Sequence, residues 1–285
     1  MLALSLLLVF CSGLAHAVWN FLAKRSEEKA VFLWTILVPS NAILLVYAIV
    51  EIARKGLPWQ GIVLALLSMA VQGLYAKLLA YTYTQGDLSL VYPIMRGTST
   101  LLVPVIGVAF MSESLHVWGW AGIGCMLVGF ALMSGWNPVG GRRDMELRPV
   151  ALALSVGLCT TTYTLIDKLF LDYLSPLSLL GIANIGFMLG ITRAALPLTR
   201  IRLAVRLHWK VLIAGAVLSP GSYLLFLFAM QHAPVSSIAP LREVGIVFGA
   251  LFGLFLLKER QGRRRLTASA IILTGMIVIV VLGTV

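Results

Sequence analysis

Two arginines deep in apolar stretches are the first candidates for chemistry in this sequence. Arg96 follows Pro93 and Arg242 follows Pro240, and each lies about eight residues into a long hydrophobic run, or roughly 12 Å along a helix. A charged side chain at the centre of a bilayer costs about 2.5–3.5 kcal/mol, so it usually faces a cavity or a partner. Two guanidinium groups at one cavity would bind a carboxylate or a phosphonate, because the planar fork matches such oxyanions.

Glu243, the neighbour of Arg242, supports a structural alternative. Its carboxylate could neutralise Arg96 across an interface, which would make the two residues an internal ion pair in place of an anion site. In a third alternative, the substrate competes with one member of this ion pair for the other. Pro93 and Pro240 each remove a helix hydrogen bond, so they predict either helix breaks that free backbone groups at a binding site or plain kinks.

Several other side chains in the apolar runs are candidates for the same site. His16 and Asn20 have the spacing that places them on one face of a helix. His16 either carries a proton, since histidine titrates near neutral pH, or is a hydrogen-bonded packing residue. Lys77 either completes a cationic cavity or neutralises an acid. Aromatic rings are expected to wall the cavity or to lie at the lipid interface, and these are Trp19, Tyr92, Tyr163 and Tyr223.

The sequence offers no catalytic signature and no cofactor site. It has no serine elbow, zinc-binding HExxH motif or Walker loop, so neither an enzyme nor ATP-driven transport is expected. The three cysteines lie far apart in apolar runs without the spacing of metal ligands, so we interpret them as packing residues: Cys11, Cys125 and Cys159. Transport would be passive or coupled to an ion gradient, with Asp167, His16 and Glu243 as candidates for the coupling group. Asp167 could instead pair with its neighbour Lys168.

The elements that hold these residues are predicted to be membrane-spanning helices. Of the 285 residues, 60% are hydrophobic and 12% are charged, against about 25% charged in soluble domains. A bilayer core about 30 Å thick needs roughly 20 apolar residues per helix, and these continuous runs are too long for the alternating strands of a β-barrel. The first run is interpreted as a retained helix and not a signal peptide, because no positive segment precedes it. Ten helices are expected, at about residues 2–23, 30–53, 60–84, 88–111, 115–135, 149–171, 176–198, 208–231, 235–257 and 265–283.

The net charge of +11 could suggest nucleic acid, but its position argues against this partner. Basic residues gather in short segments between the apolar runs, as expected for cytoplasmic loops beside spanning helices. When the connections are numbered along the chain, the even ones hold little beyond Arg54 and Lys55. This pattern places the odd connections in the cytoplasm and both termini outside. The odd ones hold Lys24, Arg25, Lys29, Arg142, Arg143, Arg148, Arg200, Arg202, Arg206, Lys258, Arg260 and residues 263–265.

An internal repeat divides the chain near its longest polar connection. The pairs Arg96/Arg242 and Glu113/Glu259 are each 146 positions apart, with similar residues around them. Each half would hold five helices, and because five is an odd number, the second copy would enter the membrane from the opposite side. The expected fold is therefore all-α, with ten transmembrane helices as two inverted five-helix repeats. The predicted boundaries are 1–135 for the first repeat, 136–148 for the linker and 149–285 for the second repeat.

Four motifs that contain these residues resemble those of a known family. They are His16-Ala-Val-Trp19-Asn20 with Lys24, Tyr163-Thr-Leu-Ile-Asp167-Lys168, Gly86-Asp-Leu-Ser89 leading to Tyr92-Pro93-Ile-Met-Arg96, and Ala239-Pro240-Leu-Arg242-Glu243 leading to Leu257-Lys-Glu259-Arg260. Their order over nearly the full chain resembles the drug/metabolite transporter superfamily, specifically tandem EamA-domain proteins. The resemblance implies a ten-helix transporter with a central cavity lined largely by its first, third, fourth, sixth, eighth and ninth helices.

The same resemblance implies a metabolite exporter. Many relatives export amino acids or other metabolites, and some are encoded beside phosphonate-catabolism genes. Relatives usually have both termini in the cytoplasm, whereas the loop charges here favour the opposite orientation. Exporters of quaternary ammonium compounds in the superfamily use a glutamate in the first helix. No Asp or Glu lies between Met1 and Lys24, so that mechanism is not transferred to this chain.

The sequence thus predicts a secondary transporter that exports a small organic metabolite, with anionic or zwitterionic compounds favoured, such as an amino acid or a phosphonate-type compound. The expected location is a bacterial-type inner membrane, crossed many times. The expected partners are the substrate and the lipid bilayer, with protons and a homodimer as further candidates and no nucleic acid. The alternatives are a flippase for a lipid-linked carrier or lipid, and a non-transporting membrane scaffold.

Overall fold

Every element that the computed structural model describes is a helix, as the sequence predicts. The described residues are 2–25, 28–85, 88–134, 147–196, 198–248 and 263–283. Most of the predicted linker 136–148, the end of the expected helix 235–257 and Glu259 lie outside them. The helices are α1 (Leu2–Arg25), α2 (Lys29–Lys55), α3 (Trp59–Gln85), α4 (Leu88–Phe110), α5 (Val117–Ser134), α6 (Leu147–Phe170), α7 (Pro176–Ala195), α8 (Leu198–His232), α9 (Val235–Leu241) and α11 (Arg263–Leu282).

Eight of these helices, α1 to α8, are long and apolar enough to cross a membrane, and α11 contains a shorter apolar stretch, Leu266–Leu282. Their outer faces carry large apolar side chains such as Ile43, Leu66 and Val217, which are largely exposed. Soluble proteins rarely expose continuous apolar surface of this extent. The outer surface is therefore suited to lipid, and the structure supports eight of the ten predicted spans directly.

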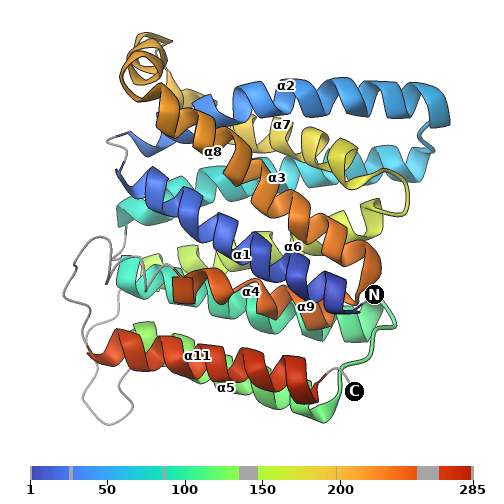
Figure 1. The fold of residues 1–285 in the computed structure, drawn as a ribbon, viewed down its shortest axis with the longest axis vertical. Coiled ribbons are helices and arrows are strands. Elements are labelled where there is room, and N and C mark those ends of the chain that lie inside the picture. Colours follow the sequence, from blue (N-terminus) through green and yellow to red (C-terminus); the bar gives the residue numbers. More distant parts are fainter. Residues whose placement is uncertain are drawn as a thin grey trace.

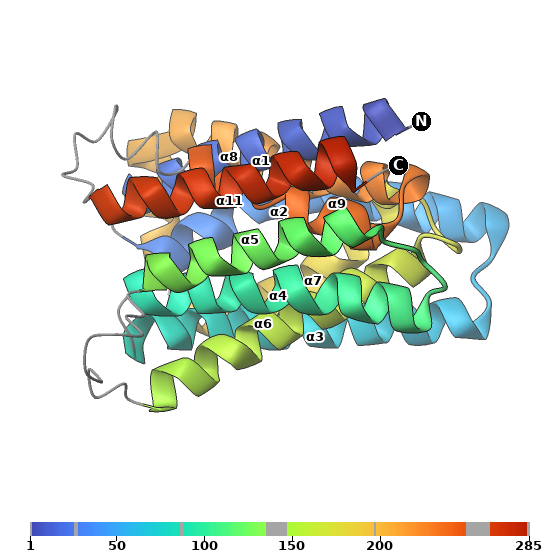
Figure 2. The same cartoon turned by 90° about the horizontal axis from the view of Figure 1, so that it is seen from below.

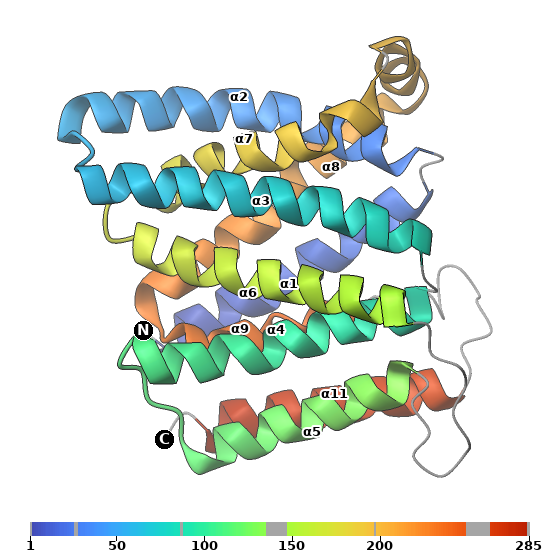
Figure 3. The same cartoon turned by 180° about the vertical axis from the view of Figure 1, so that it is seen from behind.

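The long helices lie side by side and alternate in direction. Helices α1, α3, α5 and α7 end at one end of the bundle, while both marked termini lie at the other (Figure 1). Helices α2 and α7 form one edge of the molecule, and α5 and α11 form the opposite edge (Figure 3). Figure 2 looks from this second edge, where α5 packs closely on α11. Helices α4 and α9 lie between the two edges and pack on each other.

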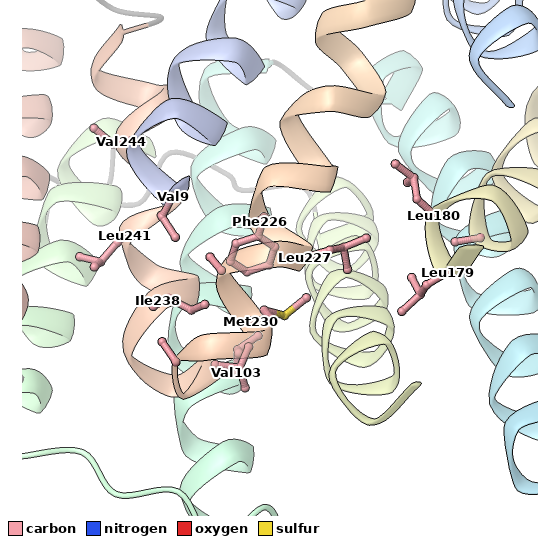
Figure 4. Packing of buried hydrophobic residues seen from close by; sticks show 14 of the residues in the cluster. Val9, Val103, Leu179, Leu180, Phe226, Leu227, Met230, Ile238, Leu241 and Val244 are labelled. Carbon is pink, nitrogen blue, oxygen red and sulfur yellow. The ribbon is translucent and has the colours of Figure 1, made fainter. Parts of the chain in front are cut away.

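The main apolar core joins α1, α4, α8 and α9. Figure 4 shows Phe226 and Met230 of α8 beside Ile238 of α9, with Val9 and Val103 on either side. These five side chains are almost fully buried. Burial of a large aliphatic or aromatic side chain contributes about 1.5–3 kcal/mol, so this cluster holds the short helix α9 against α8.

The start of α8 differs from the sequence prediction. The sequence predicts a loop before residue 208, but α8 begins at Leu198 and bends at His208, where φ is −130° and ψ is 24°. The first turns of α8 are seen end-on, in gold, in Figures 1 and 3, so they cross the direction of the other helices. The prediction was wrong because the basic residues lower the hydropathy of this segment, although arginine is a good helix former.

Candidate functional site

A small cavity lies between α4, α6, α8 and the α9 segment, and its walls are mostly polar side chains. Its volume is about 20 Å³, which is room for roughly one water molecule. A metabolite does not fit in a space of this volume, so binding there would require the surrounding helices to move apart. The lining residues are Arg96, Ser99, Thr100, Val103, Thr160, Thr164, Phe226, Ala239, Arg242 and Glu243.

Arg96 has two polar partners at this cavity. Its Nη1 lies 3.3 Å from Glu243 Oε1, and its Nη2 lies 3.0 Å from His16 Nε2. The guanidinium also lies over the Tyr92 ring, at 5.4 Å from the ring centre. Because an arginine side chain can only donate, Nε2 of His16 must accept, which makes His16 neutral with its proton on Nδ1. That Nδ1 atom is buried and has no hydrogen-bond partner among the described residues.

Arg242 differs from Arg96 because no carboxylate of the described residues lies within ion-pair distance of it. Its guanidinium lies over two aromatic rings, at 4.7 Å from the centre of Tyr223 and 4.8 Å from that of Phe226. Cation–π contacts of this kind stabilise a desolvated charge but leave its N–H donors free for a ligand. Of the two arginines, Arg242 is therefore the one whose donors are available.

Asp167 on α6 forms a second buried polar group next to the cavity. Ser68 Oγ donates to Oδ1 at 2.7 Å, and the Tyr223 hydroxyl donates to Oδ2 at 2.6 Å. The carboxylate is completely buried. Tyr223 thus contacts Asp167 through its hydroxyl and Arg242 through its ring, and it connects the acid to the cavity. The expected pair of Asp167 with Lys168 is not formed, because Lys168 Nζ donates to the carbonyl groups of Met230 and Ala233.

Close backbone contacts bring the helices of the site together. A Cβ atom on Gly157 of α6 would lie 2.9 Å from the carbonyl oxygen of Met95 on α4. A Cβ atom on Gly245 would lie 3.1 Å from the carbonyl oxygen of Gly13 on α1. The absence of a side chain at these glycines permits such close approach, and the second contact places His16, one turn after Gly13, within reach of Arg96.

The two prolines have different local effects. Helix α4 continues through Pro93 from Leu88 to Phe110. In contrast, α9 ends one residue after Pro240, and the next residues form tight turns in which the N–H groups of Arg242 and Glu243 donate to Ala239 and Pro240. The turn at Pro240 directs Arg242 to the cavity, whereas at Pro93 the helix remains continuous.

The structure does not bring every candidate residue to the cavity. Lys77 is exposed on α3, and Asn20 is exposed and donates to the backbone carbonyl of His16. Trp19 contacts the His16 ring edge-on, with ring centres 5.1 Å apart, and its buried Nε1 has no hydrogen-bond partner among the residues that the structure describes. Tyr163 is buried and packs edge-on against Tyr223, at 6.0 Å between ring centres. Neither Trp19 nor Tyr163 lines the cavity itself.

Several small polar residues of this site are not among the candidates from the sequence. Ser68 binds Asp167, and Thr100 lines the cavity with a buried hydroxyl that has no hydrogen-bond partner within the described part of the chain. Thr160 and Thr164 line the opposite wall. The sequence does contain a signal for two of them, because a spacing of four residues places Thr160 and Thr164 on one face of a helix. Such residues are common in spanning helices, so their type alone does not separate a cavity wall from packing.

Comparison with known proteins identifies the second half of the chain. Residues 147–281 match the family model of the EamA-like transporter family. This part of the chain is an EamA-like transporter domain. The predicted membership in the drug/metabolite transporter superfamily is confirmed, and the chain is a multi-pass membrane transporter.

A solved structure described as a crystal structure of a protein is similar in fold along nearly the whole chain. Its TM-score is 0.67 at 15% sequence identity, and the match covers 98% of this chain and 96% of that one. The likeness concerns the fold alone. Comparison with curated proteins gives no match.

The EamA-like domain contributes about half of the candidate site. Asp167, Tyr223, Arg242 and Glu243 lie within the matched residues 147–281. Arg96 and its partner His16 come from the first half of the chain. The cavity is thus formed where the EamA-like domain meets the preceding helices, and neither half contains all of its charged groups.

Proposed function

We propose that this EamA-family transporter is a secondary exporter of small anionic or zwitterionic metabolites, such as amino acids or phosphonate-type compounds, in a bacterial-type inner membrane. The observation that carries the proposal is Arg242, whose guanidinium lines a buried cavity without a carboxylate partner among the described residues. An oxyanion would satisfy its free donors in bidentate geometry. A buried cation without such a ligand would keep part of its desolvation cost.

The pair of Arg96 and Glu243 favours a zwitterion over a simple anion. In the proposed complex, the substrate carboxylate binds Arg242, and its ammonium group competes with Arg96 for the Glu243 carboxylate. The buried hydroxyl of Thr100 and the Nδ1–H of His16 are further partners for substrate oxygens. This corresponds to the third alternative from the sequence. The Arg96–Glu243 ion pair holds the cavity together, and the substrate replaces part of that ion pair when it binds.

The small cavity requires a second arrangement of the helices for substrate entry. We propose that two inverted halves move against each other, and the packing of the helices supports this symmetry. Helix α1 packs on α8 as α6 packs on α3, and α2 packs on α8 as α7 packs on α3. When α1 to α5 are matched in order with α6, α7, α8, α9 and α11, the first pair of each comparison corresponds to the second pair. Such repeats support alternating access to a shared site.

Asp167 is the proposed coupling group. Tyr223 contacts both Asp167 and Arg242. Protonation of the Asp167 carboxylate would therefore change the affinity of Arg242 for an anion, and a bound anion would change the affinity of Asp167 for a proton. Binding at two such sites is linked, and the linkage is reciprocal. A proton gradient could therefore drive an anionic or zwitterionic solute through this chain without ATP.

Transport by the purified protein in proteoliposomes tests the proposal. Vesicles with an imposed pH gradient are offered a panel of amino acids, phosphonates, neutral sugars and quaternary ammonium compounds. We expect movement of solutes that carry a carboxylate or phosphonate, and loss of that movement in Arg242→Gln. Arg54→Gln, at the end of α2, is the matched control and should transport normally. Transport of only neutral or cationic solutes, or full activity in Arg242→Gln, would contradict the proposal.

The flippase alternative would need a lateral apolar opening that reaches the polar cavity. An apolar groove does lie between α2 and α8, but none of its lining residues lines the cavity. A lipid-linked substrate in that groove would not contact Arg242. The groove therefore does not favour a flippase.

A further inference from the structure

An apolar groove lies between α2 and the first half of α8, apart from the candidate site. Its volume is about 430 Å³, within the range of about 300–1,000 Å³ that is typical of ligand pockets. Trp34 and Val38 of α2 form one wall, and Val205, Trp209 and Ile213 of α8 form the other. Val205, Trp209 and Ile213 are substantially exposed. The walls are apolar enough to take a hydrocarbon chain.

The groove is built by the bend of α8. At His208 the helix changes direction, so that residues 198–207 cross the direction of the bundle (Figure 1). An ion pair of Arg200 with Glu28, at 3.3 Å, fixes the start of α8 beside the start of α2. Because this segment crosses the bundle at one end of the spanning helices, we place it in the plane of the membrane interface.

Basic residues flank the lining residues of α8 in the sequence. Arg202 and Arg206 are exposed, and each is the direct neighbour of a lining residue, Ile201 or Val205. Neither has a carboxylate within ion-pair distance among the described residues, and α8 itself contains no Asp or Glu. Lys210 adds a third cation, 5.5 Å from the centre of the Trp209 ring. Basic residues in this position attract the phosphate groups of anionic lipids.

We infer that this groove binds an anionic phospholipid, with one acyl chain between α2 and α8 and the headgroup phosphate at Arg202 and Arg206. The apolar walls account for the chain, and the unpaired arginines account for the headgroup. A zwitterionic lipid would place its own cation near three basic side chains, so it should bind less tightly. The site is separate from the transport cavity, because the two share no lining residue.

Lipid binding to the purified full-length chain tests this inference. Native mass spectrometry in a neutral detergent counts bound dioleoyl phosphatidylglycerol or dioleoyl phosphatidylcholine, which have the same acyl chains. We expect one tightly held phosphatidylglycerol, and binding weaker by about 30-fold in the double variant Arg202→Gln/Arg206→Gln, since each basic residue near the headgroups is worth about a factor of five. Val205→Trp, which fills the groove, should abolish binding of both lipids.

The matched control is Arg54→Gln/Lys55→Gln, which removes the same charge at the last residues of α2. We expect this variant to retain the phosphatidylglycerol of the natural chain. Equal affinity for the two lipids in the natural chain would overturn the inference, as would an unchanged phosphatidylglycerol preference in the arginine double variant. It would also be overturned if Val205→Trp stays folded, keeps its lipid and instead loses a dimer, since the groove would then be an interface between two copies of the chain.

Discussion

At the scale of single residues, the two arginines at the cavity look equivalent in the sequence but have different surroundings in the structure. Arg96 is held by Glu243 and His16, whereas Arg242 lies on two aromatic rings. The sequence left an anion site and an internal ion pair as alternatives. The structure pairs Arg96 with Glu243, and Arg242 has no carboxylate within ion-pair distance among the described residues, so the anion site is proposed at Arg242. A substitution at Glu243 and one at Arg242 should therefore have different consequences.

Glu243→Gln is expected to destabilise the protein more than Arg242→Gln does. Glu243 is 7% exposed and Arg96 is 18% exposed, so loss of the carboxylate leaves a mostly buried cation without its counter-charge. Breaking a buried pair from one side costs about 3 kcal/mol, which corresponds to a fall in Tm of roughly 6–12 °C. Thermal unfolding in detergent measures the difference. The double variant Arg96→Gln/Glu243→Gln should recover much of the loss, and equal melting of single and double variants would refute the ion-pair assignment.

Asp167→Asn is expected to separate gradient-driven transport from exchange. The amide can still accept a hydrogen bond from Ser68 or Tyr223, but it cannot take up and release a proton. Solute accumulation driven by a pH gradient should fall to the level of passive equilibration, while exchange of labelled for unlabelled solute continues. Ser68→Ala, which removes one partner and leaves the carboxyl group, is the control. Gradient-driven accumulation that survives in Asp167→Asn would exclude this residue as the coupling group.

At the scale of elements, the junction between α8 and α9 is fixed from both sides. Lys168 donates to carbonyl groups at the end of α8, and both carboxylate oxygens of Glu113 accept N–H groups at the start of α9, each at 2.8 Å. The residue before α9 is Pro234, whose side chain cannot cap the helix. Glu113 thus supplies the missing cap from a distant part of the chain and favours α9 electrostatically as well.

Replacement of Glu113 is expected to loosen this junction. Glu113→Ala removes both acceptors, and loss of a cap costs about 0.5–2 kcal/mol. Hydrogen exchange at the amides of Val235 and Ser236 should accelerate, and Tm should fall by a few degrees. Ser114→Ala, at an exposed neighbouring position, should change neither quantity. Unchanged exchange in Glu113→Ala would show that the apolar packing of α9 suffices without the cap.

The element scale also shows what the sequence could and could not predict. Long apolar runs determined α1 to α7 to within a few residues at both ends, and α8 at its end only, because lipid requires each backbone polar group to be satisfied within a helix. The bent start of α8 was missed, since its arginines resemble a loop in hydropathy. Arg96, Arg242 and Glu243 were singled out by their rarity in apolar runs. Ser68 and Thr100 were not, because only tertiary packing distinguishes a cavity hydroxyl from the others.

At the scale of the whole molecule, the two ends of the bundle differ in charge. The described basic residues Arg148, Arg200 and Arg264 lie at or near the starts of α6, α8 and α11, which begin at the end opposite the marked termini (Figure 1). The other end carries Arg54 and Lys55. The positive-inside rule therefore favours termini outside the cell, whereas family usage favours termini inside.

Single introduced cysteines decide the orientation. In a background with the three natural cysteines replaced by serine or alanine, Lys55→Cys and Arg202→Cys mark opposite ends, and both native side chains are exposed. With a membrane-impermeant maleimide added to intact cells, we expect Lys55→Cys to react and Arg202→Cys to react only in inverted vesicles. That result would place the basic first turns of α8 on the cytoplasmic leaflet, where anionic lipids are concentrated and the proposed lipid groove has its ligand. The reverse pattern would show that the charge asymmetry does not set the topology, and it would leave the arginines of α8 facing the outer leaflet.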